Sequence, residues 1–155
     1  MAAGRHSGGI DMADNPELDR IASSLQMQQA KGEAIRTQMQ QMEATILEIG
    51  AAVDAIQNLK KAKADALVPV GAGVFISCPK PDPDKVVLNI GANVMVSKKP
   101  EEAVKLLEER QRKISDAISA AQEDMGELIR AIDELSQRAS GIAAAEGKNV
   151  RPPKE

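Results

Sequence analysis

The chain holds few residues that could do chemistry, and the first candidates are two glycine-rich turns. Residues 70–77 read VGAGVFIS and residues 90–97 read IGANVMVS, so the same turn recurs twenty positions later. Glycine-rich turns can hold a phosphate, but neither copy has the full spacing of a GxGxxG or GxxxxGK[ST] motif. Glycine also adopts the positive φ that a tight turn between two strands requires. We therefore interpret Gly71, Gly73 and Gly91 as turn residues between short strands.

Histidine, cysteine and carboxylate side chains form no recognisable catalytic or metal-binding pattern. His6 is the only histidine of the 155 residues, and Cys78 is the only cysteine. A catalytic triad or a typical zinc site needs several such groups together. The acidic residues fall mainly on expected helix faces, where a solvated surface is the usual role. We expect no enzyme activity, no metal ion and no cofactor.

Composition and charge argue against several further classes of protein. A net charge of −3 gives no general basic field for nucleic acid. No apolar run approaches the roughly 20 residues that span a bilayer, and the N-terminus lacks the apolar core of a signal peptide. One Phe and no Trp or Tyr argue against a bulky globular core and favour long helices that bury a narrow seam. We expect a cytoplasmic protein that binds neither nucleic acid nor membranes.

Two long apolar repeats predict the elements that position everything else. Both have the alternating three- and four-residue spacing of a coiled-coil seam. Asn15 before Pro16 predicts the start of the first helix, because Asn is a good cap and Pro suits the first helical position. The first repeat comprises Leu18, Ile21, Leu25, Gln28, Gly32, Ile35, Met39, Met42, Ile46, Ile49, Val53 and Ile56, and the second comprises Val104, Leu107, Gln111, Ile114, Ile118, Ala121, Met125, Leu128, Ile132, Leu135, Ala139 and Ile142.

The two repeats match layer by layer when one helix folds back antiparallel on the other. Leu18 then faces Ile142 at one end, and Ile56 faces Val104 at the other. Gly32, which offers little apolar surface, faces Leu128. In every layer at least one of the two facing residues is a large apolar residue. This matching predicts a coiled-coil hairpin within one chain.

Four β-branched runs between the helices predict two short β-hairpins, joined by glycine turns and by the sequence PKPDPD. Pro69 limits the first strand to an edge or an irregular position. So small a strand set cannot fold alone, so we expect it to join strands of other subunits in a closed oligomeric barrel. The expected assembly strands contain Val74, Phe75, Ile76, Val86, Val87, Leu88, Val94 and Val96.

The resulting fold class is α+β: a long antiparallel coiled-coil hairpin with a four-strand region between the helices. One domain spans residues 16–140, between a disordered leader at 1–15 and a disordered tail at 141–155. Within it we expect a helix at 16–66, β-hairpins at 67–97 and a helix at 100–140.

The strand region also resembles a known family. LVPVGAG at residues 67–73 and the strand, GA turn and strand at 86–96, flanked by two long helices, are similar to the alpha class of prefoldin. Asn93 stands where that family often has a second turn glycine. The resemblance covers residues 18–142 and implies an ATP-independent chaperone in which two alpha and four beta subunits share a β-barrel platform. It further implies that coiled-coil tips hold unfolded polypeptides and deliver them to a group II chaperonin.

The free ends of the helices are the expected client-binding tips. Terminal coiled-coil layers lack neighbours on one side and fray, which exposes apolar side chains. Two alternatives remain open: these residues only close the last turns, or the chain is a structural scaffold that docks defined partner helices. The expected tip residues are Leu18, Ile21, Leu25, Met27, Ile129, Ile132, Leu135 and Ile142.

Overall fold

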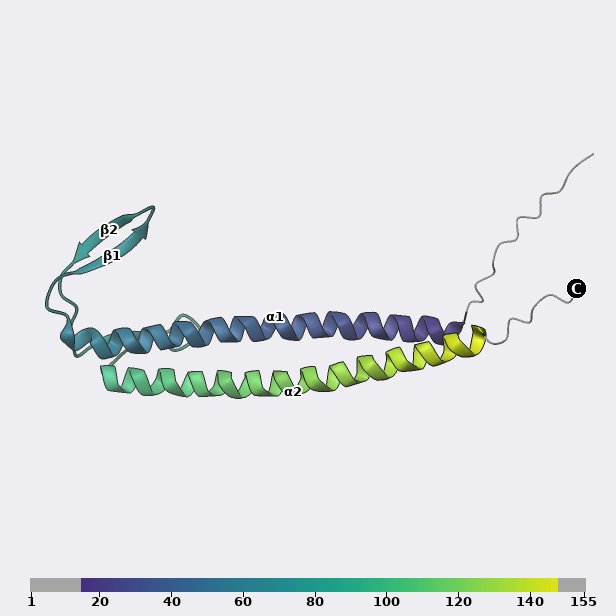
Figure 1. Cartoon of the computed structure of the whole chain (residues 1–155). Helices are drawn as coiled ribbons and strands as arrows, with labels where there is room; N and C mark the ends of the chain where they lie inside the picture. Colours follow the sequence, from purple (N-terminus) through teal and green to yellow (C-terminus); the bar gives the residue numbers. More distant parts are fainter. Residues whose placement is uncertain (1–14, 148–155) are drawn as a thin grey trace, which may run out of the picture. The chain divides into compact units, whose positions relative to one another are not determined.

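The computed structural model describes residues 15–147 (Figure 1). Residues 1–14 of the expected leader at 1–15, with His6, and residues 148–155 of the expected tail lie outside the described residues. In chain order the elements are α1 (Pro16–Asn58), a short 3₁₀ helix η1 (Leu59–Lys61), β1 (Ala66–Gly71), β2 (Val74–Cys78), β3 (Val86–Asn89), β4 (Met95–Lys98) and α2 (Pro100–Gly147).

The chain divides into two compact units. The tip unit contains the start of α1, up to Ile35, and the end of α2, from Asp124. The strand unit contains Arg36–Glu123 and therefore all four strands. The predicted fold class is confirmed, because two long helices flank four strands in two antiparallel hairpins.

The coiled-coil seam lies where the apolar repeats predict it. Every residue of both repeats is buried or half-buried, although most other helical positions are exposed. In the tip unit a Cβ atom added at Gly32 would lie 3.2 Å from Cδ2 of Leu128. Gly32 and Leu128 therefore share a layer, which confirms the predicted antiparallel register at this point.

The start of α1 is also as predicted. The Oδ1 atom of Asn15 accepts a hydrogen bond from the backbone N–H of Glu17 at 2.9 Å. The Asn15 carbonyl accepts the first helical bond from Asp19 at 3.1 Å. Asn15 thus caps the helix, and Pro16 occupies the first position, where no N–H is needed.

The helix predicted at 16–66 ends earlier in the structure. At Leu59 it tightens into η1, and the N–H of Ala62 bonds to the carbonyl of Leu59 at 3.2 Å. Ile56 is the last residue of the first apolar repeat, and the α-helix ends two residues later, at Asn58. Ala66 instead pairs with Cys78 in the first β-hairpin.

The helix predicted at 100–140 continues to Gly147, so part of the expected disordered tail is helical. Gly141 does not end it. Ala143, Ala144 and Ala145 follow, and alanine has the highest helix propensity of all residues.

The two glycine turns have the same backbone conformation. Each has three consecutive residues with positive φ, so the sequence repeat is a repeat of turn geometry. The third residue is Gly73 in one turn and Asn93 in the other, and Asn is among the residues that tolerate a left-handed conformation best. The φ values are 111°, 50° and 76° at Gly71, Ala72 and Gly73, and 116°, 48° and 58° at Gly91, Ala92 and Asn93.

The hairpins themselves are simple antiparallel pairs. β1 pairs with β2 and β3 pairs with β4, and no ladder joins the two pairs within residues 15–147. The register of the first pair shifts between Pro69 and Gly71. This irregularity is expected next to a proline, which has no N–H to donate.

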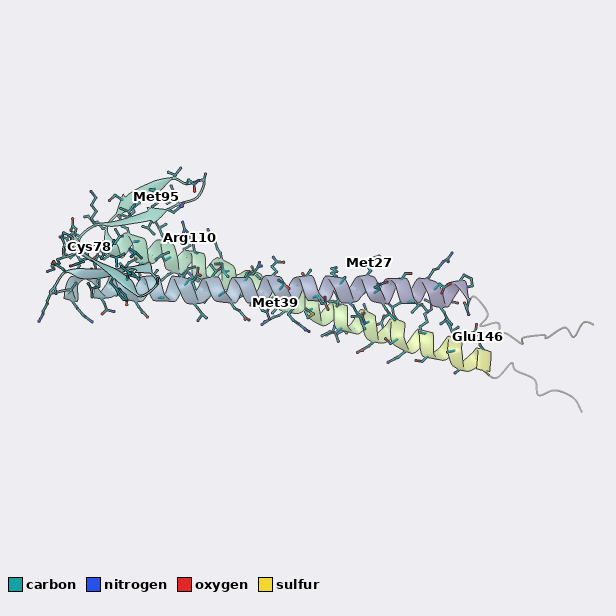
Figure 2. The ribbon with its side chains drawn as sticks, turned by 90° about the horizontal axis from the view of Figure 1, so that it is seen from above. Met27, Met39, Cys78, Met95, Arg110 and Glu146 are labelled. Carbon is teal, nitrogen blue, oxygen red and sulfur yellow. The ribbon has the colours of Figure 1, made fainter. Side chains whose placement is uncertain are left out.

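A small core attaches the second hairpin to the helices. Leu88 of β3 is only 9% exposed and packs with Ile49 of α1 and with Ala103 and Leu107 of α2. Arg110 of α2, labelled in Figure 2, donates a hydrogen bond from Nη2 to the carbonyl of Asn89 at 2.8 Å. These contacts fix β3 and β4 against the helices of the strand unit.

Candidate assembly surface and tip grooves

Large apolar side chains are exposed along the two β-hairpins. Within residues 15–147, thirteen large apolar residues are exposed, and ten of them lie between Leu67 and Met95. Apolar surface of this extent is unusual on a monomer and typically marks an interaction site. The ten residues, called the hairpin surface below, are Leu67, Val68, Val70, Val74, Phe75, Ile76, Val87, Ile90, Val94 and Met95.

The first hairpin is exposed on both of its faces. Val68 lies opposite Ile76, and Pro69 lies opposite Phe75. Because side chains alternate along a strand, these two cross-strand pairs lie on opposite faces of the hairpin. Val68, Phe75 and Ile76 are all exposed, so the described residues of this chain cover neither face.

The second hairpin covers one face and exposes the other. Leu88 lies opposite Val96, and both contact the small core. On the other face Val87 is 61% exposed and Met95 is 60% exposed. Figure 2 shows Met95 on this hairpin in the strand unit.

Three of the eight residues predicted for assembly therefore pack within the chain instead. Val86, Leu88 and Val96 face the helices, because the buried face of β3 and β4 completes the small core. Val94 lies in the turn before β4, where its N–H bonds to the carbonyl of Gly91 at 2.9 Å, but its side chain remains exposed.

Five residues of the hairpin surface were not predicted from the sequence. They are Leu67, Val68, Val70, Ile90 and Met95. Alternation along the strands was the available signal, because Met95 and Val87 fall on one face and Val96 and Leu88 on the other. The runs are apolar at nearly every position, however, so the pattern did not show which face meets the helices.

Polar contacts fix the ends of the hairpins and helices. The Oδ1 atom of Asp65 accepts a hydrogen bond from the N–H of Lys80 at 3.2 Å, which closes the base of the first hairpin. Lys60 forms a 2.8 Å ion pair with Glu101 at the start of α2. Their hydrogen bond raises the pKa of Lys60 and lowers the pKa of Glu101.

The expected tip residues are mostly enclosed between the helices. Ile21 is only 6% exposed, and the other expected seam residues of the tip are half-buried. Met27 and Ile129 lie off the seam and are 71% and 52% exposed. Figure 2 shows Met27 on α1. The enclosed expected residues are Leu18, Ile21, Leu25, Ile132, Leu135 and Ile142.

Polar side chains connect the two helices of the tip unit. Arg138 donates from Nε to Oε1 of Glu17 at 3.1 Å and forms an ion pair with the same carboxylate through Nη2. The Nδ2 group of Asn15 donates to Oε1 of Glu146. One contact starts from α1 and the other from its cap, Asn15, and both reach α2, so they stabilise the paired state of the helix ends.

Two open grooves adjoin these contacts. Their volumes are about 390 and 420 Å³. They share Ser24, Leu135 and Arg138, so they lie next to each other on the tip unit. The first is lined by Pro16, Glu17, Arg20, Ile21, Ser24, Leu135 and Arg138, and the second by Ser24, Gln28, Ala131, Glu134, Leu135 and Arg138.

No metal site or membrane span accompanies these features in the part of the chain that the structure describes. Residues 15–147 contain no cluster of three or more His, Cys, Asp or Glu side chains that could hold a metal ion. None of the described helices is long and apolar enough to cross a bilayer.

Comparisons with known proteins agree on one family. The family model described as "Prefoldin subunit" matches residues 28–145. The chain is 27% identical over 132 residues to the prefoldin subunit alpha of Pyrococcus horikoshii, which covers 83% of this chain and 89% of the relative. It is 30% identical over 143 residues to the prefoldin subunit alpha of Nitrosopumilus maritimus, and this match covers 83% of this chain and 99% of the relative.

The chain is also similar to a solved structure. The chain resembles a chain of a filamentous PFD from Methanocaldococcus jannaschii, determined by cryo-electron microscopy, with a TM-score of 0.67 and 25% identity. The match covers 74% of this chain and 97% of the other.

Proposed function

We propose that this chain, which belongs to the prefoldin family, acts as the alpha subunit of an ATP-independent chaperone that holds unfolded polypeptides. In this proposal two copies combine with four beta-type prefoldin subunits in the cytoplasm. The tips of the complex bind unfolded polypeptides, and the complex delivers them to a group II chaperonin.

The observation that carries the proposal is the hairpin surface. Ten exposed apolar side chains on two small hairpins are unfavourable in water and become favourable once neighbouring strands cover them. Each hairpin is a two-stranded pair and so leaves backbone groups free along its edges. Strands of other subunits can satisfy these groups and close the sheet into a barrel.

The tip unit supports the proposed binding of unfolded polypeptides. It combines enclosed apolar side chains on the seam with exposed Met27 and Ile129 off the seam. Methionine is flexible and polarisable, so it suits contacts with clients of many sequences. This property favours a chaperone over a protein that recognises one ligand.

A second candidate function uses the same helices. A structural scaffold would assemble through its hairpins and dock one defined partner helix along the coiled coil. Leu47 on α1 of the strand unit is 75% exposed and is the position where such a partner helix would pack.

One experiment separates the two candidates. The chain is co-expressed with a beta-type prefoldin subunit, and the mass of the purified complex is measured by native mass spectrometry. We expect a hexamer with two copies of this chain. The complex is then added without nucleotide to three unrelated denatured proteins during dilution, and light scattering is followed.

A chaperone suppresses the scattering of all three proteins. A complex that forms but protects none of them supports the scaffold. If no complex forms with any beta-type subunit, the proposed assembly is wrong.

A further inference from the structure

We propose that the junction between the helices and the β-hairpins binds an acidic segment of a partner protein that carries one apolar anchor residue. Two independent features point to this occupant: an excess of lysines at the junction and an apolar groove beside them. The residues of both features lie outside the hairpin surface and outside the tip unit, so this site is separate from the surfaces proposed for assembly and for client capture.

Charge is distributed unevenly along the chain. Residues 59–105 contain eight lysines and five carboxylates, whereas the other described residues, 15–58 and 106–147, contain eight basic and fifteen acidic side chains. The junction is therefore positive within a chain that is otherwise acidic. The eight lysines are all exposed and are called the junction lysines below: Lys60, Lys61, Lys63, Lys80, Lys85, Lys98, Lys99 and Lys105.

Most of the junction lysines have no carboxylate partner. Lys60 pairs with Glu101 at 2.8 Å, and Lys98 reaches Glu102 at 4.0 Å. The other six form no ion pair with the described residues of the chain. Carboxylates of a partner could therefore pair with these six without breaking an existing ion pair.

The fold gathers the junction lysines at the bases of the two hairpins. The backbone N–H of Lys80 bonds to Oδ1 of Asp65, which lies two residues after Lys63. Lys85 precedes β3 and Lys98 ends β4, and these two strand ends are paired. Each hairpin base therefore carries lysines from both of its chain segments, close in sequence to a helix end.

An apolar groove lies where the seam between the helices ends. α1 ends at Asn58 and α2 begins at Pro100, so Ile56 and Val104 form the last layer of the seam. Both are only half-buried, and together with Pro100 they supply the apolar lining of a groove of about 370 Å³. This groove, called the junction groove below, is large enough for one apolar side chain of a partner.

The junction lysines adjoin the junction groove. Lys60 and Lys105 line it, together with Glu101 and Glu108. The hydrogen bond from Lys60 is the main cause of the lowered pKa of Glu101, and the charge of Lys99 adds to the same shift, so Lys99 also lies near the groove. A leucine bound in the groove would therefore lie among three lysines, two of which have no ion pair.

An acidic protein segment matches these two features better than nucleic acid does. Nucleic acid presents a continuous row of phosphates, with about one charge per 1.7 Å in duplex DNA. Carboxylates lie among the junction lysines and would repel such a row, and a phosphate backbone has no apolar group for the junction groove. A peptide with spaced carboxylates around one apolar residue satisfies both. The carboxylates are Asp65, Asp82, Asp84, Glu101 and Glu102.

The first test measures binding of a defined peptide. The probe is Asp-Glu-Glu-Leu-Glu-Glu-Asp with an N-terminal fluorescein, titrated with the purified full chain and followed by fluorescence anisotropy. We expect saturable binding that weakens at least about fivefold between about 50 and 300 mM salt, because salt screens exposed charges. Absence of saturable binding overturns the inference.

The second test removes junction charges that have no partner in the chain. A variant with Lys63→Gln, Lys99→Gln and Lys105→Gln should bind the peptide about tenfold more weakly, since each exposed ion pair contributes modestly and three are lost. Circular dichroism should show an unchanged fold, because all three side chains are exposed and form no ion pair with the described residues.

A matched control loses the same amount of charge elsewhere on the chain. It carries Lys31→Gln, Arg36→Gln and Arg112→Gln, three exposed positions outside residues 59–105. This control should stay within about twofold of the parent at the lower salt concentration. Equal weakening by the two triple variants would reveal only a general charge effect and overturns the inference.

The third test concerns the anchor residue. Replacing the leucine of the peptide by glutamine should weaken binding about fivefold, because the junction groove then buries no apolar side chain. A benzophenone side chain in the place of the leucine should crosslink within residues 56–60 and 100–108, as located by mass spectrometry. Crosslinks that lie only elsewhere, or equal binding of the leucine and glutamine peptides, overturn the inference.

Nucleic acid is tested as the other possible occupant. A fluorescein-labelled oligothymidine of the same charge as the peptide is titrated under identical conditions. We expect it to bind more weakly than the peptide. Tighter binding of the oligothymidine that is lost in the Lys63, Lys99 and Lys105 variant would assign the site to nucleic acid and overturn the inference.

Discussion

At the scale of single residues, the repeated glycine turns have the clearest physical explanation. Gly71 and Gly91 have φ values of 111° and 116°, a region that side chains with a Cβ rarely adopt. Nothing lies within 4 Å of a Cβ added at either position, so backbone strain rather than a clash would oppose substitution. Asn93 with φ of 58° shows that a left-handed position in the same turn accepts a residue other than glycine.

Gly71→Val and Gly91→Val should therefore weaken assembly. Valine in such a conformation costs about 1–3 kcal/mol per site, which should distort the turn and the hairpin surface beside it. Native mass spectrometry after co-expression with a beta-type subunit should show less hexamer for each variant. The matched control is Asn93→Gly, which relieves strain and should assemble like the parent. Normal hexamer from both valine variants would contradict the role of the turns.

At the scale of elements, the two faces of β3 and β4 have different roles. One face completes a small core with α1 and α2, and the other contributes Val87 and Met95 to the hairpin surface. Truncating Leu88, which faces the core, should therefore affect stability, whereas truncating its neighbour Val87, which faces outward, should affect assembly.

Leu88→Ala should lower the free energy of unfolding of the isolated chain by about 2 kcal/mol or more, because a buried leucine leaves a cavity. Val87→Ala should change it by less than about 0.5 kcal/mol, as is usual for exposed positions, but should reduce the yield of hexamer. Urea unfolding followed by circular dichroism measures the first effect, and native mass spectrometry measures the second. Equal effects of the two substitutions on unfolding would show that the strand does not pack as described.

The elements also show what the sequence could and could not predict. The seam was predictable residue by residue, because a three- and four-residue spacing allows only one buried stripe on a helix. Which face of each strand packs against the helices was not predictable, because the strand sequences are apolar on both faces. The helix ends were not predicted correctly: the first helix ends at Asn58, soon after the last residue of its apolar repeat, and the second continues through the alanine run at 143–145.

The candidate tips show a similar division. The sequence identified the apolar residues near the helix ends, and the structure encloses most of them between the helices. The two tip grooves were not foreseen, because each is lined by residues of both helices, such as Ser24 of α1 and Ala131 of α2. Only the antiparallel register, applied to positions beside the seam, could have indicated them.

At the scale of the whole molecule, the two proposed activities fall on different units. The hairpin surface belongs to the strand unit, and the candidate tip residues belong to the tip unit. Assembly and client capture should therefore be separable by substitution.

The most direct measurement of this claim is the light scattering of a diluted denatured protein in the presence of a tip variant. The variant carries Leu18→Ser, Ile21→Ser, Leu135→Ser and Ile142→Ser, and is purified as the complex with a beta-type subunit. Each lost side chain could contribute about 1.5–3 kcal/mol when a client buries it fully, which for Ile21, at 6% exposure, requires the helix ends to separate. We predict a complex of the parent mass that has lost most of its protection against aggregation, with little dependence on salt because the contact is apolar. A complex that protects as well as the parent would contradict the account, because the tips of this chain would then only close the coiled coil.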